Sequence, residues 1–550
     1  MKYQELVDVY EALAATTKRL EKTEILSNFF KTVDSELIDK VTLLCLGKVF
    51  PSWSEEEQGI GDKLVMKAVA DVAGVSVLDV ENEVNNQGDI GAASEVLVEN
   101  KKQMTFFSQA LTIEFVFNNL RKLAKISGEK STSRKISIIL ELLSSASATE
   151  SKYICRTIVE QLRIGVGEGI IRDSLSDAFG IDKKIVDRAT MLTNDLGLVA
   201  KVGETEGAEG LEKLNLTPGK PVKLMLAQLS EGIDISINEM KKALCETKYD
   251  GIRCQIHKHN GEVTLFTRRL ENITKAIPEI VDAVNKGLPD EDFVAEGEII
   301  AMRDGKPLSF QNILHRVRRK YNIEEAMENI PVELYLYDLL YYKKPLIDEA
   351  MEKRREILES ITDTSTDMIN LSELVICTPD NVKDAQDLFK RSIAGGHEGI
   401  MIKNAFEPYI PGVRGKKMLK YKAEPENLDA VVVGGTKGIG KRGEFIGSYL
   451  IALQDEDENL KTVAQVGTGL TDEQLEELTK KMEEYKISQK GTKITVEPRI
   501  IFEVAYSEIV KSPEYEAGYS LRFPVVKRIR EDKGLKDIDT VERLKSMYKE

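Results

Sequence analysis

The 550-residue sequence has few cysteines, a single tryptophan and no long hydrophobic run. Its five cysteines are scattered and odd in number, and no two of them form a CxxC pair: Cys45, Cys155, Cys245, Cys254 and Cys377. This pattern excludes a disulfide framework and a zinc ribbon and favours a reducing cytoplasm. No apolar segment approaches the roughly 18 to 20 residues that span a bilayer, and the N-terminus MKYQELVDVYE lacks a signal-peptide core. We therefore expect a cytoplasmic protein that does not associate with membranes.

The net charge of −15 argues against indiscriminate binding to polyanions. Basic residues nevertheless cluster in three runs that contain no acid: HRVRRKY (315–321), VRGKKMLKYK (413–422) and KGIGKR (437–442). One such run alone would favour an ordinary solvated loop. Three of them in an acidic protein favour a segregated binding face. The four histidines show no metal-ligand spacing.

The chain is too long for one hydrophobic core, and its pattern predicts three domains. Residues 1–215 carry apolar residues at three- and four-residue spacing, which predicts an all-α domain. Within it, GVGEG (165–169) is a Gly-rich turn before a helix, which either presents backbone N–H groups to a phosphate or only connects two helices. The segment LTPGKPVK (216–223) is typical of a linker.

Strand and helix patterns alternate over residues 216–421, which predicts a mixed α+β domain. Residues 422–550 contain short strand-like runs punctuated by glycine, typical of a small β-barrel such as an OB-fold. A terminal helix is expected from Leu535 onward.

The stretch ETKYDGIRC (246–254) contains a lysine, Lys248, two residues before Asp250-Gly251. Asp-Gly here and Asn260-Gly261 further on are turn signals between apolar runs, typical of a surface meander with a solvated lysine. A match to KxDGxR arises by chance in about one chain in a hundred of this length. The motif alone is therefore suggestive rather than decisive.

Further charged residues are embedded in apolar strand patterns. Glu296 and Glu298 are two residues apart and so face one side of a strand, and Lys420 and Lys422 do the same further on. Glu398 precedes another predicted strand. Charges in such positions are costly unless they are paired or bind an ion, which favours one shared site over independent surface charges.

At these residues the chain resembles the nucleotidyltransferase superfamily of ATP-dependent DNA ligases and mRNA-capping enzymes. The motifs that carry the resemblance are KYDGIR, TRRLENIT, VAEGEIIA, YLYDLLYY, HEGIMIK, KMLKYK and RFPVVKRIRED. LGKVFPSW and RIGVGEGIIRDSLSDAF resemble the helical DNA-binding domain of replicative ligases, those of archaea most closely, and GKPVKLMLAQ resembles their linker. The resemblance covers nearly the whole chain.

The resemblance implies a ligase that uses ATP and Mg²⁺ on nicked duplex DNA. Lys248 would attack the α-phosphate of ATP, AMP would pass to the 5′-phosphate of a nick, and the 3′-hydroxyl would then displace AMP. Neighbouring cations would favour the neutral, nucleophilic amine of Lys248. The implied domains are a DNA-binding domain (1–215), an adenylation domain (216–421) and an OB-fold domain (422–550).

The resemblance also implies roles around the nucleotide. Glu246 would read the adenine amino group, and Tyr337 would stack on the base. Glu298 and Glu398 would contact ribose and Mg²⁺, whereas Glu296 is expected to be a solvated neighbour.

The remaining implied roles belong to cations. Arg253 and Arg268 would hold ribose or phosphates, and Arg268 would also lie near the 5′-phosphate of the nick. The α-phosphate would be bound by Arg414, Lys420 and Lys422. The pyrophosphate would be oriented by Arg528, Arg530 and Lys533. Because these last residues lie far along the chain from Lys248, the barrel is expected to close for the first step and to swing away for DNA.

QMTFF (103–107) resembles a sliding-clamp-binding peptide, with Gln103, Phe106 and Phe107 as contacts. The two phenylalanines are equally compatible with burial in the helical core. The protein is expected to be a monomer.

Three alternatives remain. A GTP-using capping enzyme is disfavoured by the helical N-terminal region and by Glu246, and an NAD-dependent ligase by the absence of a four-cysteine site. A catalytically inactive scaffold would be expected to have lost some of these charges.

Overall fold

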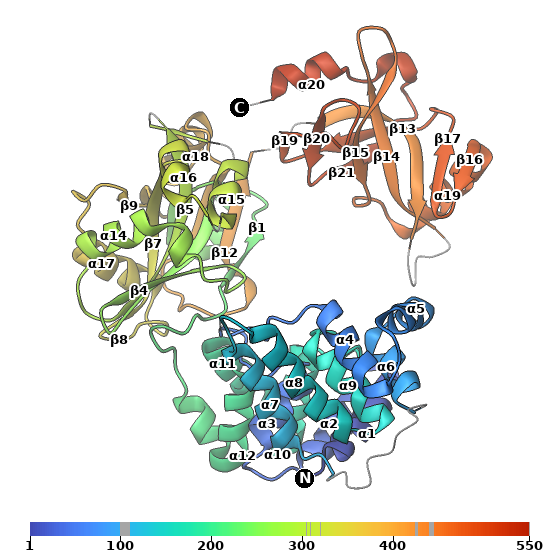
Figure 1. Ribbon diagram of the computed structural model, residues 1–550. Helices are drawn as coiled ribbons and strands as arrows, with labels where there is room; N and C mark the ends of the chain where they lie inside the picture. Colours follow the sequence, from blue (N-terminus) through green and yellow to red (C-terminus); the bar gives the residue numbers. More distant parts are fainter. Residues whose placement is uncertain are drawn as a thin grey trace. The chain divides into compact units, whose positions relative to one another are not determined.

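The structure is a computed structural model that describes residues 1–54, 56–99, 110–303, 305–308, 310–319, 321–423, 427–438 and 445–548, the side chains of residues 311 and 318 excepted. The chain divides into two compact units, Met1–Tyr421 and Lys422–Glu550 (Figure 1). Across the described ranges, no helix is long and apolar enough to cross a bilayer.

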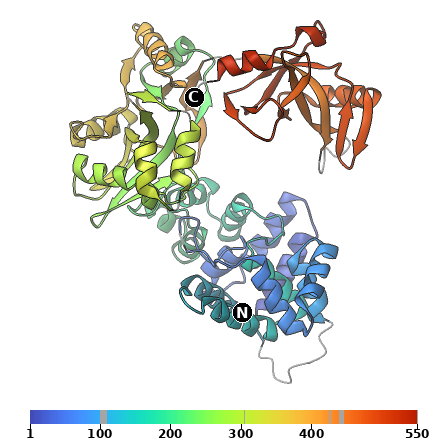
Figure 2. The same cartoon turned by 45° about the horizontal axis from the view of Figure 1, so that its top comes forward.

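The N-terminal part of the first unit is built of helices (Figure 2). Their bounds are α1 (Tyr3–Ala14), α2 (Arg19–Phe30), α3 (Ile38–Leu44), α4 (Asp62–Ala73), α5 (Val77–Gln87), α6 (Ile90–Glu99), α7 (Ile113–Lys125), α8 (Ser131–Ser145), α9 (Ala148–Ile158), α10 (Glu168–Phe179), α11 (Lys183–Thr193) and α12 (Leu196–Lys213).

Helix α7 shows how the sequence produces this part. The Thr112 hydroxyl accepts a hydrogen bond from the Phe115 backbone N–H and so caps the helix start. The apolar residues Ile113, Val116 and Leu120 recur at three- and four-residue spacing and are fully buried in the helical core.

The rest of the first unit contains two sheets. The first has strand order β1-β12-β11-β2-β10. Its strands are β1 (Leu226–Leu229), β2 (Ala243–Lys248), β10 (Leu374–Cys377), β11 (Gly399–Asn404) and β12 (Arg414–Lys422). The helices α13 (Ile233–Met240) and α18 (Val382–Ala394) pack their apolar residues against this sheet in one core.

The second sheet has the order β4-β3-β5-β7-β8, with β6 and β9 at its margins. Its strands are β3 (Ile252–His259), β4 (Glu262–Thr267), β5 (Phe293–Arg303), β6 (Lys306–Pro307), β7 (Val332–Tyr342), β8 (Lys344–Pro345) and β9 (Ile369–Leu371). The helices of this part are α14 (Pro278–Gly287), α15 (Phe310–Arg318), α16 (Ile323–Asn329) and α17 (Met351–Ile361).

The second unit is rich in strands and has a core of its own. Its strands are β13 (Asn427–Lys437), β14 (Ile446–Gln454), β15 (Leu460–Val466), β16 (Lys486–Lys490), β17 (Lys493–Val496), β18 (Ile501–Ala505), β19 (Glu508–Lys511), β20 (Tyr519–Arg522) and β21 (Val525–Ile529). Its helices are α19 (Asp472–Glu484) and α20 (Val541–Met547). The predicted fold class is confirmed: a helical region, an α+β region and a strand-rich region follow one another along the chain.

One local expectation is met and two need correction. Asn260-Gly261 does form a two-residue hairpin turn between β3 and β4, with φ of 52° and 80°. Asp250-Gly251 instead joins strands of different sheets, because β2 pairs with β10 and β11 whereas β3 pairs with β4 and β5. The terminal helix begins at Val541, capped by Thr540, and only a short 3₁₀ turn stands at Leu535–Asp537.

The basic run at 315–321 is also not uniformly a binding face. The Arg316 side chain is 0% exposed. Its guanidinium donates to both carboxylate oxygens of Glu279, at 2.6 and 2.9 Å, and to the Ala276 carbonyl. This buried pair holds α15 to the first turn of α14 and, through the Ala276 carbonyl, to the segment before it, so part of this run is structural.

Arg354 and Asp338 form a second buried pair, between α17 and β7. Arg354 Nε and Nη2 lie 2.8 and 3.1 Å from the two oxygens of Asp338. We expect Arg354→Met to destabilise the protein by about 3–5 kcal/mol, because it leaves a buried carboxylate uncompensated. Denaturant unfolding would measure this loss.

The neighbouring Lys353→Met is the matched control, since Lys353 pairs with Glu356 on the exposed surface. It should change stability by less than about 0.5 kcal/mol. Equal effects of the two variants would contradict the assignment.

Candidate active site

Lys248 ends β2 and faces an acid from the neighbouring strand. Its ammonium Nζ lies 2.5 Å from Glu398 Oε2. The Glu398 backbone N–H also donates to the Lys248 carbonyl at 3.0 Å, just before β11 pairs with β2 at Gly399. Strand pairing therefore places the predicted nucleophile and a predicted metal ligand side by side.

Glu298, on β5 of the second sheet, lies within electrostatic reach of Lys248 and Glu398. Burial raises the pKa of its carboxyl to about 7. The charges of Lys248 and Arg253 lower this pKa, and those of Glu398 and Asp250 raise it further, so all four lie within electrostatic reach. The crossover at Asp250-Gly251 is what brings the two sheets together here.

Gly251 makes this approach possible. A Cβ at this position would lie 2.5 Å from Ile300 Cγ2 and closer still to the Ile299 carbonyl oxygen on β5. Only glycine lets the chain after Lys248 run this close to the neighbouring backbone.

Glu246 is buried two residues before Lys248, with 1% of its surface exposed. Its two oxygens lie 3.1 Å from Arg355 Nη1 and 2.5 Å from Lys403 Nζ. Lys403 Nζ also lies 4.5 Å from the centroid of the Tyr337 ring. The residues expected to read and stack on adenine are thus brought together around one lysine.

The surroundings of Glu296 differ from what the sequence predicted. Glu296 is not a solvated neighbour: it is 0% exposed, and its Oε2 lies 2.6 Å from Arg253 Nη2. Its other oxygen accepts from Tyr409 and Gln255. The physical reason is that a carboxylate in the middle of a central strand is buried and needs partners.

The Nε–H group of Arg253 is a further feature of the site. Its Nε is buried and has no hydrogen-bond partner within the described part of the chain. Its guanidinium lies 5.9 Å from the Tyr337 ring centroid.

The predicted phosphate-binding cations Arg268, Arg414, Lys420 and Lys422 lie at or near strand ends. Arg268 is exposed directly after β4, and Arg414 is exposed at the start of β12. Lys420 and Lys422 lie near the end of β12, both half-buried. β12 runs parallel to β1 and places Lys420 opposite Leu229.

The predicted pyrophosphate-orienting cations lie in the second unit and bind acids there. Arg528 Nε lies 2.5 Å from Glu503, and Lys533 Nζ 2.5 Å from Asp429. Arg530 Nη1 lies 3.2 Å from Asp429, and its Nη2 lies 2.7 Å from Asp532. Gln103, Phe106 and Phe107 lie outside the described residues.

The sequence reading missed four residues that complete the first-unit site: Arg355, Lys403, Tyr409 and Gln255. Two of them carried a usable signal. Arg355 falls on the buried face of α17 with Met351 and Leu358, at helical spacing, and Lys403 interrupts an apolar strand. Tyr409, in the loop after β11, carries no such signal.

Comparisons with known proteins agree along the whole chain. Three family models match: "DNA ligase N terminus" over residues 2–176, "ATP dependent DNA ligase domain" over 224–422 and "ATP dependent DNA ligase C terminal region" over 442–533. The chain is 66% identical to a DNA ligase of Methanobrevibacter smithii over 548 residues, which covers 100% of both chains. The chain belongs to the ATP-dependent DNA ligase family.

Other comparisons are consistent with this family. A DNA ligase of Methanothermobacter thermautotrophicus is 57% identical, with 99% of this chain and 98% of that one covered. A DNA ligase of Thermococcus fumicolans is 43% identical, with 100% and 98% covered. A solved structure titled Pmar-Lig_PreS3 shares the fold at 19% identity and a TM-score of 0.56, covering 96% and 99%. The expected ATP-dependent ligase class is confirmed over the capping-enzyme and NAD-dependent alternatives.

The acids around Lys248 are of the type that binds a hard divalent cation. Within the described ranges, no group of three or more His, Cys, Asp or Glu side chains is arranged to hold a metal by itself. Glu298 and Glu398 are, however, two carboxylates near each other, and burial holds the pKa of Glu298 far above its ordinary value. Such a pair gains from a hard divalent cation that takes its other ligands from phosphate and water.

Substitution of Gly251 tests the geometry of this site. Gly251→Ala should lower the rate of covalent AMP transfer to the enzyme at least about 100-fold, because the added methyl group pushes the chain after Lys248 away from β5. Radiolabelled ATP would measure the adduct.

Gly61→Ala is the control, because a Cβ there meets no atom within 4 Å. It should label at the wild-type rate. Normal labelling of a folded Gly251→Ala protein would refute the close approach.

Proposed function

We propose that this chain seals nicks in duplex DNA through a covalent AMP adduct on Lys248. The observation that carries this proposal is the position of the Lys248 amine, at a strand end beside Glu398 and within electrostatic reach of the half-buried Glu298. The nitrogen attacks the α-phosphorus of ATP, a P–N bond forms, and the P–O bond to pyrophosphate breaks. The adduct passes AMP to the 5′-phosphate of the nick, and the 3′-hydroxyl displaces AMP as the phosphodiester forms.

The chain's own charges support this sequence of steps. Lys248 must lose a proton before attack, and the Glu398 carboxylate at 2.5 Å is placed to take it. Glu246 reads the adenine amino group from a position fixed by Arg355 and Lys403. The Nε–H of Arg253, which has no hydrogen-bond partner among the described residues, is available to ribose or phosphate, since a buried donor without a partner costs free energy that a ligand restores.

Mg²⁺ is part of the proposal, with Glu298 and Glu398 as its protein ligands. When bound, it would neutralise charge on the phosphates during transfer. Tyr337 stacks on the base, while Arg414, Lys420 and Lys422 stabilise the α-phosphate and Arg268 the 5′-phosphate of the nick. Arg528, Arg530 and Lys533 orient pyrophosphate.

The proposal extends to organisation and partners. Residues 1–215 bind DNA, 216–421 carry the adenylation site, and 422–550 form the OB-fold domain that must approach Lys248 for the first step. The protein acts inside the cell on chromosomal DNA as a monomer. Gln103, Phe106 and Phe107 are the proposed contacts with a sliding clamp.

Lys248→Ala tests the nucleophile. It should reduce formation of an acid-labile, base-stable AMP adduct by about 10⁴-fold or more, because the attacking atom is gone. It should still join a nick whose 5′-phosphate has been adenylylated beforehand, since the last step does not use the lysine.

Lys242→Ala is the matched control. Lys242 directly precedes β2 but pairs with Glu352. It should label normally. An adduct that survives in Lys248→Ala would overturn the proposed nucleophile.

Glu298→Gln tests the metal site. The neutral amide is a weaker ligand, so the Mg²⁺ concentration for half-maximal adduct formation should rise at least about tenfold. Chelation with EDTA should abolish labelling of the wild type. The exposed Glu291→Gln serves as the control, and an unchanged Mg²⁺ requirement in a folded Glu298→Gln protein would remove Glu298 from the ligand set.

A further inference from the structure

The segment between the helical and α+β regions, residues 219–225 (the linker), is bound along one face of β3. The Gly219 N–H donates to His257 Nδ1 at 3.1 Å, and the Val222 N–H donates to Gln255 Oε1 at 3.0 Å. Arg253 Nη1 donates to the Met225 carbonyl at 2.7 Å. Residues 253, 255 and 257 alternate along the strand and therefore point to the same side.

The direction of each hydrogen bond in this row is determined. Burial lowers the pKa of His257 to about 3, so the ring is neutral. Because Nδ1 accepts from Gly219, the proton sits on Nε2, which lies 3.0 Å from Gln255 Oε1. The Gln255 amide is thereby oriented with its nitrogen toward Glu296 Oε1, at 3.1 Å, and the Val222 carbonyl, at 3.3 Å.

Tyr409 closes the network. Its hydroxyl donates to Glu296 Oε1 at 2.6 Å and accepts from the Met225 N–H at 2.9 Å. Glu296 Oε2 in turn accepts from Arg253. The nucleotide-site arginine is thus held by a buried carboxylate whose other oxygen is shared by two side chains, and both of those also bind the linker.

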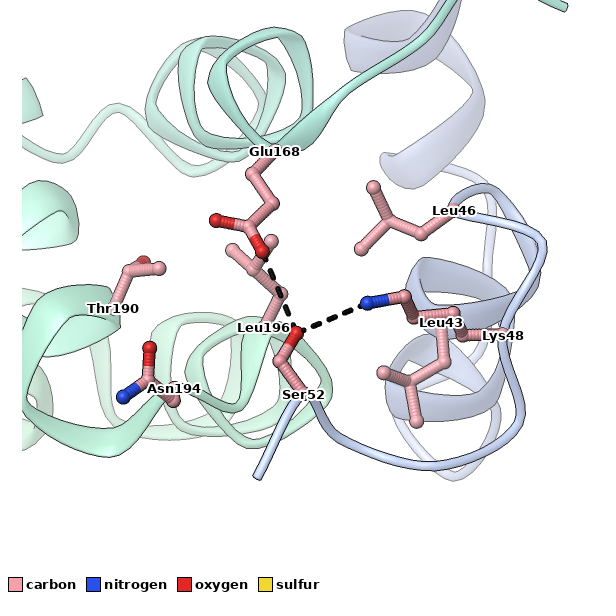
Figure 3. Close-up of a pocket in the computed structure, with 8 residues that line it drawn as sticks. All are labelled: Leu43, Leu46, Lys48, Ser52, Glu168, Thr190, Asn194 and Leu196. Atoms are coloured by element: carbon pink, nitrogen blue, oxygen red, sulfur yellow. Dashed lines mark hydrogen bonds between the residues drawn. The ribbon is translucent and has the colours of Figure 1, made fainter. Parts of the chain in front are cut away.

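The other side of the linker is bound to the helical region. The Lys223 N–H donates to the Met191 carbonyl at 3.0 Å, and Asn194 Nδ2 donates to the Pro221 carbonyl. Lys223 Nζ lies 3.5 Å from Glu168. Asn194, Glu168 and Ser52 line a cavity of about 10 Å³ between the helices (Figure 3). The linker therefore has specific partners on both sides.

The linker also lies beside a tryptophan whose fluorescence can report on the position of the linker. Lys220 Nζ lies 5.1 Å from the ring of Trp53, the single tryptophan of the chain. Emission from this ring therefore reports the position of the linker from a helical-region loop that belongs to none of the elements around Lys248.

We propose that Gln255 and Tyr409 are positioning residues that orient Glu296, and through it Arg253, for nucleotide binding, and that they couple the linker to the nucleotide site. This inference rests on the proposed role of Arg253 in holding ATP. The physical reason is that Arg253 donates to the linker carbonyl and to Glu296 at the same time. Displacement of the linker removes one of these acceptors and leaves the guanidinium free to change direction.

Tyr409→Phe is the sharpest test, because it deletes one hydroxyl that serves both the linker and Glu296. The experiment measures adduct formation at Lys248 as a function of ATP concentration in the full chain, together with acrylamide quenching of Trp53. We expect KM for ATP to rise at least about fivefold with kcat within twofold of wild type, as for a lost hydrogen bond to a charged group. Quenching of Trp53 should increase.

Tyr341→Phe is the matched control. Tyr341 packs against the same apolar cluster, but its hydroxyl donates to the Lys343 carbonyl and belongs to none of the bonds above. It should change neither KM nor quenching. Lys220→Met calibrates the Trp53 signal, and Gln255→Met repeats the test if Tyr409→Phe does not fold.

The possible results distinguish the positioning role, the coupling to the linker and the proposed function from one another. An unchanged KM in a folded Tyr409→Phe protein overturns the positioning role, and a raised KM with unchanged Trp53 quenching overturns the coupling to the linker. A raised KM together with raised quenching supports both. Failure of the proposed function appears elsewhere, as an adduct that persists in Lys248→Ala, whereas Tyr409→Phe must still reach the full adduct at saturating ATP.

Discussion

Charge compensation inside the α+β region is the constraint on which the site depends. Carboxylates at Glu246, Glu296 and Asp338 are buried within strands, and each is stable there only because a cation from another element reaches it. Two of the cations, Arg354 and Arg355, come from neighbouring positions of α17. The same requirement that stabilises the two sheets therefore fixes the directions of the side chains around Lys248.

A consequence is that the site is organised before any nucleotide arrives. Arg253 is held by Glu296, and the Lys248 ammonium by Glu398. Preorganised charges lose little freedom when a ligand binds, which is the condition for strong stabilisation of a phosphoryl transfer. In the proposed mechanism some of these partners are exchanged, since a proton would leave Lys248 and a metal would share Glu398. On that proposal the ion pairs hold the site together until the substrate replaces them.

The second unit follows the same rule with different partners. Its candidate cations are bound by Asp429, Glu503 and Asp532, which belong to that unit. These acids keep a dense cationic segment folded against its own strands. If Arg530 or Lys533 engages ATP as proposed, that engagement would compete with these contacts.

The sequence by itself determined the order of the three regions and the residues of chemical interest, because helical and alternating periodicities and charges in apolar strands are local signals. It singled out Lys248, Glu298 and Glu398 as candidates without showing that a crossover at Asp250-Gly251, not a hairpin, joins two sheets there. Strand order depends on pairing between residues far apart, which local patterns do not encode.

Only the tertiary structure determined which charged side chains are buried and paired and which are solvated. In the folded chain Glu296 lies buried at the centre of a hydrogen-bond network, and Arg316 is buried in the core and is not part of a binding face. It also brought Tyr409 and the linker to Arg253. Whether a polar side chain is solvated, paired or left for a ligand depends on which distant groups the fold brings within 3 Å of it, and that is a property of packing.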